Sequence, residues 1–252
     1  MGRQALWLVG AGLLLLQGCA SLPSGKPDPR DRFERFNRGV YAFNDAIDRA
    51  ALKPVAKGYK KAVPAPVRNG VSNFFSNLSL PRTILNDLLQ GKFTEGTRAT
   101  LRLTVNTVLG LGFFDPAGRA GLANQNEDFG QTLGKWGVPS GPYLVLPLLG
   151  PSTVRDGLGR IPDIYDNPEQ LVSDDYAYWG TLALDAVDTR SQLLAQDPIL
   201  QRSFDPYGFV RNAWLQHREF LVRDGDVPAD NAGDADAPPD DPDALDPEKT
   251  PQ

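Results

Sequence analysis

The sequence predicts an all-α protein, and three observations support this fold class. Several segments place apolar residues three and four positions apart, which is the spacing of one face of a helix. The chain contains neither a series of segments with strictly alternating polarity nor a repeat period. Glycine (25) and proline (22) together make close to a fifth of the 252 residues, against about 12% in an average protein. We therefore expect short helices that are interrupted often.

The N-terminal residues are typical of a secretory signal. Arg3 precedes an apolar run over residues 5–16, which suits a signal-peptide core and is too short to span a membrane. The run ends in Leu16-Gln17-Gly18-Cys19, which resembles the lipobox of bacterial lipoproteins. Cys19 is the only cysteine of the chain, although Gln17 is bulkier than the usual lipobox residue. The alternative is a plain secretory signal with an incidental cysteine.

The lipobox resemblance implies a signal peptide over residues 1–18 that is cleaved before Cys19. It also implies a diacylglyceryl group on the sulfur of Cys19 and an acyl chain on its new amine, and two or more acyl chains anchor a protein stably. Ala20 follows the cysteine, and by the enterobacterial sorting pattern this implies delivery to the outer membrane. Residues 19–31 then form a short, polar, lipidated tether.

The first half of the folded body, which we place at residues 32–223, predicts four helical segments. Apolar side chains step by three and four over residues 33–52, and Pro54 is expected to end this helix. Two further amphipathic segments are expected at residues 64–78 and 81–91, each opened by proline. Residues 94–109 predict a fourth helix, which ends at a glycine.

The second half predicts two helices, at residues 174–194 and 209–222. Before them, residues 108–118 and 134–151 are apolar and aromatic, but their glycines and prolines exclude a regular helix. At membrane depth such a backbone is tolerated only where it is buried in protein or lines a wet cavity. The residues alone leave two alternatives, a membrane-embedded passage and a core loop of a soluble domain.

The C-terminal residues 224–252 contain ten acidic residues, one lysine, six prolines and no aromatic residue. Such a segment cannot bury enough apolar surface to offset its ordering entropy, so we predict a disordered, solvated tail. The tail carries a charge of −9 and the whole chain −5, so the rest carries +4. A mildly basic body suits a surface near anionic lipid headgroups.

Composition and motifs exclude several kinds of site. One cysteine and one histidine rule out cysteine-rich zinc sites, disulfide frameworks and histidine clusters, so no metal is expected. The sequence holds no motif that predicts a nucleic-acid partner. It also lacks the motifs of serine hydrolases, P-loop enzymes and zinc proteases, so neither a catalytic residue nor a cofactor is expected.

A few residues could still take part in chemistry. His217, the only histidine, lies in an amphipathic helix, where we expect an exposed or capping role. The acid pairs Asp163/Asp166 and Asp174-Asp175 could act as acid and base, but a helix N-terminus or a turn explains them better. Three aromatic residues could either anchor at the level of lipid headgroups or pack in the core: Trp136, Tyr143 and Trp179.

The body also contains a series of strings in a fixed order between about residues 31 and 223. Examples are Phe33-Glu34-Arg35-Phe36-Asn37-Arg38, Pro64-Ala65-Pro66-Val67-Arg68-Asn69-Gly70, Phe129-Gly130-Gln131-Thr132-Leu133-Gly134, Gly141-Pro142-Tyr143-Leu144-Val145-Leu146-Pro147 and Gly150-Pro151-Ser152. This series resembles the MlaA/VacJ family of outer-membrane phospholipid-transport lipoproteins. The chain departs from the family at Phe113, where a second glycine is common, and at Pro139-Ser140, which replaces a glycine-rich loop.

The resemblance implies a ring of amphipathic helices in the inner leaflet of the outer membrane, with glycine- and proline-rich breaks around a central channel. Phospholipids would leave the outer leaflet through this channel and pass to a soluble periplasmic lipid carrier of the Mla pathway, while a trimeric porin holds the ring. Two other functions stay open, a membrane-anchored lipid-modifying enzyme such as a phospholipase and an adaptor lipoprotein without transport. The candidate channel or hinge residues are Gly110, Gly112, Phe113, Gly137, Gly141, Tyr143 and Gly150.

Overall fold

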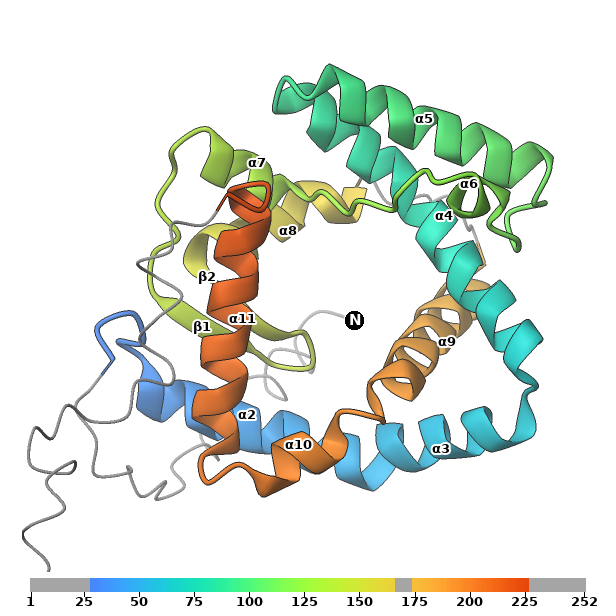
Figure 1. The fold of residues 1–252 in the computed structure, drawn as a ribbon. Coiled ribbons are helices and arrows are strands. Elements are labelled where there is room, and N and C mark those ends of the chain that lie inside the picture. Colours follow the sequence, from blue (N-terminus) through green and yellow to red (C-terminus); the bar gives the residue numbers. More distant parts are fainter. Residues whose placement is uncertain (1–27, 166–173, 227–252) are drawn as a thin grey trace, which may run out of the picture.

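The computed structural model describes residues 28–165 and 174–226. Seen face-on in Figure 1, its helices form a ring, and a small β-hairpin completes one side. The predicted helical class and the ring are confirmed. The expected signal peptide, Cys19, Asp166 and the acidic tail from residue 227 onward lie outside the described residues.

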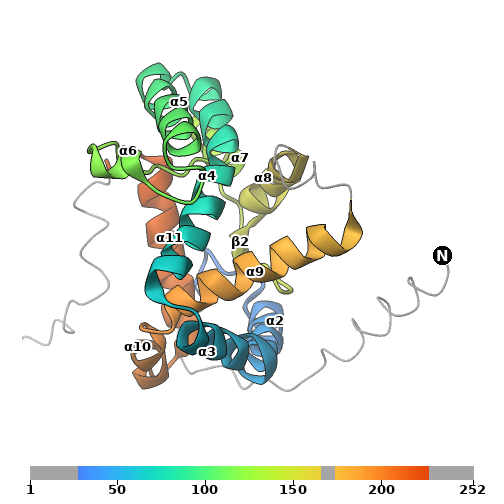
Figure 2. The same ribbon diagram turned by 90° about the vertical axis from the view of Figure 1, so that its right-hand side faces the viewer.

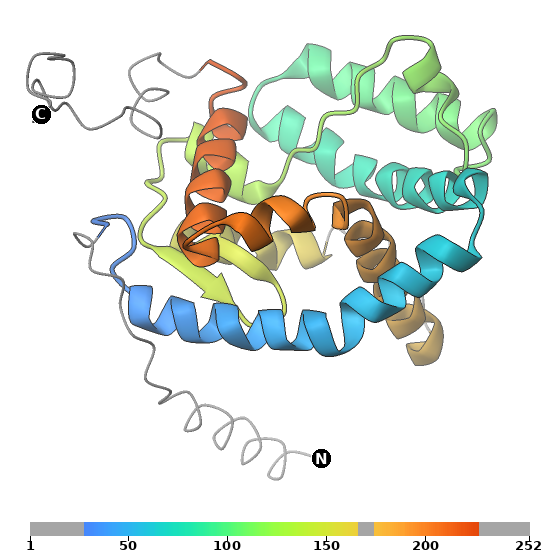
Figure 3. The same cartoon turned by 60° about the horizontal axis from the view of Figure 1, so that its bottom comes forward.

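A continuous stretch of helix forms one side of the ring (Figure 3). The helix α2 (Glu34–Ile47) leads into a π-helical turn, η1 (Asp48–Leu52), and α3 (Lys53–Ala62) follows directly. The prediction that Pro54 ends the first helix is therefore wrong. Pro54 falls in the first turn of α3, where the missing N–H costs little, and the wider π-helical turn lies directly before it.

The next side of the ring is a helical pair, α4 (Ala65–Leu89) and α5 (Phe93–Val108). The helix expected at residues 94–109 is confirmed as α5. By contrast, the two segments predicted on either side of Pro81 form the single helix α4. An interior proline removes one backbone hydrogen bond. However, α4 packs along α5 and also against the later helix α9 (Asp175–Leu193). This packing outweighs the tendency of Pro81 to break the helix.

The middle of the chain contains short elements. The helices α6 (Pro116–Arg119) and α7 (Phe129–Lys135) precede strands β1 (Tyr143–Leu146) and β2 (Gly150–Thr153), and α8 (Val154–Tyr165) follows. The strands pair antiparallel, with Tyr143 opposite Thr153. Residues 134–151 thus avoid a long helix, as predicted, although the sequence did not predict the hairpin.

Two asparagines of α2 hold the hairpin in place. Asn37 donates from Nδ2 to the Tyr143 carbonyl oxygen at 3.0 Å and accepts from the Val145 N–H at 2.9 Å. Asn44 repeats this arrangement three residues further along the hairpin: its Nδ2 donates to the Leu146 carbonyl oxygen, and its Oδ1 accepts from the Leu148 N–H. The side-chain amides therefore continue the hydrogen-bond ladder along the outer edge of β1 and into the turn after it, next to the backbone bond from the Tyr143 N–H to the Arg30 carbonyl oxygen.

Three C-terminal helices close the ring: α9 (Asp175–Leu193), α10 (Asp197–Arg202) and α11 (Pro206–Val222). The helices predicted at residues 174–194 and 209–222 are thereby confirmed, the second with an earlier start. Figure 2 shows α9 crossing beside α3, and α11 contacts α7 and β2. Arg190 fixes this closure, because its guanidinium pairs with Asp48 at 2.7 Å and with Asp197 at 2.9 Å.

Candidate functional site

The described residues bury polar side chains more often than apolar ones. Seventeen polar or charged residues are buried, against eight hydrophobic residues, whereas 32 large hydrophobic residues are exposed. The reverse distribution is the rule in water-soluble domains, and extensive exposed apolar surface marks contact with a membrane or another protein. Among the described residues, much of the exposed surface is therefore apolar, whereas most fully buried side chains are polar.

The exposed apolar residues cluster on particular elements. On α8, Leu158, Ile161 and Ile164 are each more than half exposed. The end of α5 and the turn that follows expose a second cluster: Val108, Leu109, Leu111, Phe113 and Phe114. Among the described helices, none combines the length and the apolar character that a membrane crossing would need.

Two cavities lie between elements of the ring. The larger has a volume of about 1100 Å³ and is lined by charged residues of α4, α8, α11 and the segment at residues 124–128, together with apolar residues that include Leu149, Ile164, Trp214 and Phe220. The smaller, about 420 Å³, lies between α4 and α9. Arg82, Asn124 and Asn126 line both cavities, so the two adjoin at α4.

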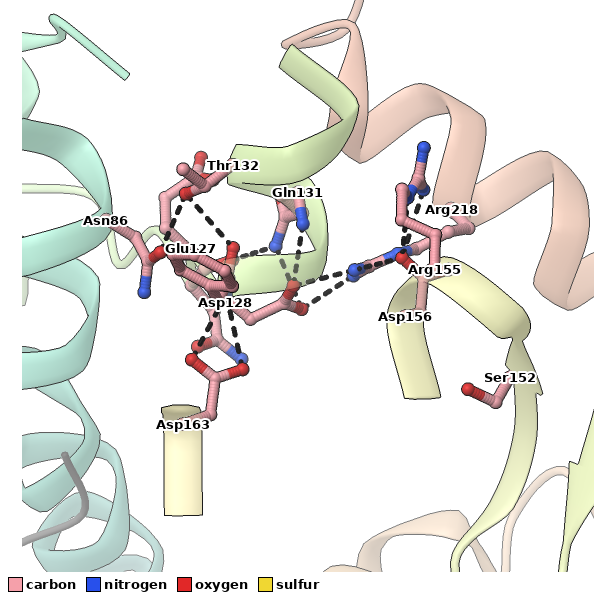
Figure 4. Close-up of polar contacts among 12 residues, drawn as sticks. Asn86, Glu127, Asp128, Gln131, Thr132, Ser152, Arg155, Asp156, Asp163 and Arg218 are labelled. Carbon is pink, nitrogen blue, oxygen red and sulfur yellow. Dashed lines mark hydrogen bonds and ion pairs between the residues drawn. The ribbon is translucent and has the colours of Figure 1, made fainter. Parts of the chain in front are cut away.

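An ion-pair network joins α11, α7 and α8 along the larger cavity (Figure 4). Arg218 of α11 binds both carboxylate oxygens of Asp128 at 2.6 Å and Asp156 at 2.9 Å. Asp156 also accepts from Arg155 and from the Thr153 hydroxyl. Burial disfavours the charged form of Asp128, but the hydrogen bonds from Arg218 outweigh it and lower the pKa of Asp128. These carboxylates are thus neutralised by arginines.

A second network links α4 to α7 and to the C-terminal end of α11. Lys92 pairs with Glu127 at 3.0 Å and with Asp224, which also accepts from Lys135 at 2.7 Å. Gln90 donates to Glu127 at 2.9 Å. Asp224 was expected at the start of the disordered tail, and this part of the prediction is wrong, because two lysines hold its carboxylate on the wall of the cavity.

Two carboxylates have environments that favour their neutral form. Asp163 of α8 is buried and accepts from the Phe129 N–H at 3.1 Å, so it caps α7, and burial raises its pKa. Asp87 of α4 is fully buried, and neither of its oxygens has a hydrogen-bond partner among the described residues. Burial, with Glu127 nearby, raises the pKa of Asp87 to about 6.

The residues predicted as channel or hinge residues lie in turns and in the wall of the ring. Gly112, Gly137, Gly141 and Gly150 all adopt positive φ, as turns require. Gly110 lies so close to its neighbours that a Cβ would approach the Phe114 carbonyl oxygen to 2.5 Å. None of the seven residues, these five glycines, Phe113 and Tyr143, lines either cavity.

The aromatic and acidic residues that the sequence left open divide as follows. Tyr143 is buried in a core cluster with Tyr207 and Trp214, whereas Trp136 and Trp179 are more than half exposed. His217 is exposed at the rim of the larger cavity. Asp174 caps α9 by accepting from the Ala177 N–H at 2.8 Å, as its predicted structural role requires.

The sequence analysis missed the residues that line the cavities. Arg82, Asp128, Arg160 and Arg218 come from four separate parts of the chain, and each resembles an ordinary surface residue of an amphipathic helix. A usable signal lies in α8, where Leu158 and Ile161 are more than half exposed and charged residues lie between them and beside them. If Leu158 and Ile161 are taken as the exterior face, Asp156, Arg160 and Asp163 fall on the cavity side, where the exposed Ile164 also lies.

Comparisons with known proteins agree with this architecture. Residues 29–221 match the family model described as MlaA lipoprotein. The chain is 39% identical to the intermembrane phospholipid transport system lipoprotein MlaA of Escherichia coli K12, over 86% of this chain and 88% of that protein. It is 34% identical to the protein of the same description from Haemophilus influenzae, over 84% and 88% of the two chains.

A solved structure is also similar. A chain described in work on the structural basis for maintenance of bacterial outer membrane lipid asymmetry superposes with a TM-score of 0.68 and 38% identity. The match covers 76% of this chain and 98% of the other. A family match over most of the body, relatives above 30% identity and a shared fold agree, and the chain belongs to the MlaA lipoprotein family.

Proposed function

We propose that this chain is an outer-membrane lipoprotein that transports phospholipids through the interior of its ring and so maintains the lipid asymmetry of that membrane. The observation that carries this proposal is the inverted polarity of the described residues: many large apolar side chains are exposed, polar side chains are buried, and the larger cavity offers both charged and apolar residues to an amphipathic lipid. The E. coli and H. influenzae relatives are described as parts of an intermembrane phospholipid transport system, which supports it.

The exposed apolar residues suit a ring that sits in the inner leaflet of the outer membrane. Acyl chains would contact the exterior, and acyl groups on Cys19 would add an anchor. Phospholipids would enter from the outer leaflet with their headgroups in the polar cavities and leave to a soluble periplasmic carrier of the Mla pathway. A trimeric porin would hold the ring, with part of the apolar exterior against it.

Transport of this kind needs no covalent chemistry. The cavities offer a headgroup polar partners that replace water, because unpaired polar groups are costly in a low-dielectric environment. A lipid that moves between such partners changes its binding site without any bond being broken. Direction then depends on the protein that receives the lipid.

We propose that the glycines at both ends of the hairpin serve as hinges for this passage. Gly141 and Gly150 hold φ values of +67° and +77°, which other residues adopt only with strain. A bulky residue at either position should impair transport more than stability. Loss of folding without a separable transport defect would contradict the hinge role.

The proposal is tested in a strain that lacks the gene. Deletion should raise the amount of phospholipid in the outer leaflet and the sensitivity to detergent plus chelator, and the intact gene should reverse both. Unchanged lipid asymmetry would contradict transport and leave an adaptor. Free fatty acid or lysolipid released by the purified protein, and abolished by His217→Ala, would instead indicate a phospholipase.

The anchor has its own test. Cys19→Ser should give an unacylated precursor that no longer fractionates with the outer membrane. Cys19→Ala serves as a second variant with the same expected outcome, since neither side chain carries the thiol that is acylated. Normal fractionation of both variants would contradict the lipobox assignment.

A further inference from the structure

Two arginines on the wall of the larger cavity have no carboxylate partner among the described residues. Arg82 of α4 donates to the amide oxygen of Asn126 at 3.1 Å, and its buried Nε has no hydrogen-bond partner there. Arg160 of α8 lines the same cavity, and none of the described carboxylates lies within ion-pair distance of it. A guanidinium carries five N–H donors and stays charged, so both side chains keep unused donors.

The neighbouring acids are already neutralised. Asp128 and Asp156 bind Arg218, Glu127 binds Lys92, and Asp224 binds two lysines. Glu95 lies 3.7 Å from Arg98. The remaining acid is Asp163, which accepts from a backbone N–H and whose pKa is raised by burial. Among the described residues that line this cavity, two guanidinium groups therefore lack an ion-pair partner, and Asp163 is the one carboxylate that also lacks one.

We propose that Arg82 and Arg160 form a phosphate-binding site inside the ring, which takes either the phosphodiester of a lipid headgroup or a free phosphate ion. Guanidinium groups match phosphate oxygens because their planar donors bind two oxygens at once. Partly buried charges without partners are costly, and an incoming phosphate removes this cost at both positions.

The position of Arg82 adds a second argument. It lines both cavities, so a group that moves from one to the other passes its guanidinium. The smaller cavity is lined mainly by serines, amides and two aspartates of α9, Asp185 and Asp188, so Arg82 is the one cation among the residues that line it. A phosphate bound at Arg160 would therefore meet Arg82 before it reaches α9.

The headgroup form of this inference rests on the proposed transport function. The test uses the acylated, full-length mature protein in an uncharged detergent and isothermal titration calorimetry. Three probes separate the sources: dihexanoylphosphatidylglycerol, dihexanoylglycerol, which lacks the phosphate, and sodium phosphate. The variants are Arg82→Gln and Arg160→Gln, with Arg119→Gln as a control that removes one exposed arginine outside both cavities.

We expect each cavity variant to weaken binding of the phosphate-containing lipid about tenfold or more, since a hydrogen bond to a charged group contributes that much. The control should bind as the unaltered protein does, and dihexanoylglycerol should bind equally to all of them. Arg82→Lys should recover only part of the affinity, because lysine keeps the charge but not the paired donors. Far-UV circular dichroism of each variant checks folding, and Arg82→Lys keeps the test valid if Arg82→Gln does not fold.

The outcomes separate this inference from the proposed function. Equal affinity of all variants for the lipid would overturn the arginine site and leave transport intact, and an equal loss in Arg119→Gln would overturn it as a general charge effect. Arginine-dependent binding of sodium phosphate without binding of the lipid would support a free-phosphate site and count against transport of headgroups. If the unaltered protein bound none of the three probes, both proposals would fall.

Discussion

Asp87→Asn should change how the stability of this protein depends on pH. The Asp87 carboxyl is fully buried in α4, its oxygens have no hydrogen-bond partner among the described residues, and its pKa is raised to about 6 by burial and by nearby acids. Below about pH 6 the folded protein therefore holds the protonated acid. Ionisation near neutral pH places a charge, which has no hydrogen-bond partner in the described part of the chain, where α4 packs against α5.

The sign and size of the effect follow from linkage. Between about pH 4 and pH 6 the folded state binds a proton that the unfolded state has released, so this residue makes the free energy of unfolding fall as pH rises. Each pKa unit corresponds to about 1.4 kcal/mol, so the rise from 3.8 to about 6 costs about 3 kcal/mol above pH 6. Below about pH 4 the cost disappears.

The assay is urea denaturation in a mild detergent at pH 4 and pH 7.5, followed by tryptophan fluorescence. An asparagine is neutral at both values, so the cost of burying its amide cancels when the two pH values are compared. The stability of Asp87→Asn relative to the unaltered protein should thus be about 2.5 kcal/mol more favourable at pH 7.5 than at pH 4, because about 0.5 kcal/mol of the cost is already present at pH 4. Asp175→Asn, on the exposed first turn of α9, is the matched control and should change by less than about 0.5 kcal/mol.

A variant-to-parent difference that is the same at both pH values would refute this reasoning, because it would mean that Asp87 has an ordinary pKa in the folded protein. A larger effect at pH 4 than at pH 7.5 would show that the ionised carboxylate is the favoured form.

Three further substitutions test the packing of the ring. Arg218→Gln should lower the free energy of unfolding by about 2 kcal/mol, because it removes the cation from the part-buried Asp128 and leaves the buried Asp156 with Arg155 alone; adding Asp128→Asn should restore part of it, and no restoration would contradict this account. Asn37→Ala should cost about 2 kcal/mol or more by leaving the backbone of β1 unpaired, measured by urea denaturation. Gly110→Ala should lower the melting temperature, since its Cβ would meet two backbone oxygens, whereas Gly58→Ala in open space on α3 should raise it slightly. Equal shifts for the two glycines would contradict the crowding at Gly110.

The helices could be predicted because local spacing determines them. In the segments 94–109 and 174–194, apolar side chains repeat at helical intervals, and both helices form where expected. The prolines were misread for a related reason. Pro54 and Pro81 both disfavour a helix locally. The helices nevertheless continue through them, because α3 packs against α9 and α4 packs against α5 and α9. A short stretch of sequence does not contain these packing partners.

The site could not be predicted in the same way. The carboxylate of Asp128 and the guanidinium of Arg218 lie 90 positions apart and meet only because α11 returns to α7. Arg82 and Arg160 resemble surface arginines in the sequence, and only closure of the ring turns them inward. Four of the five glycines singled out from the sequence adopt positive φ, a local property that glycine signals well, and their role in a channel or hinge stays a prediction.

The sequence by itself determined the helical class, most helix positions and, through its order of motifs, the family, because these depend on short-range periodicity and on strings that can be read directly. Only the tertiary structure decided which face of each helix is the exterior and which charges share a cavity. In water-soluble proteins the apolar face can be assumed to point inward. In this ring many apolar side chains are exposed, and polar residues that would ordinarily be solvated are buried against one another.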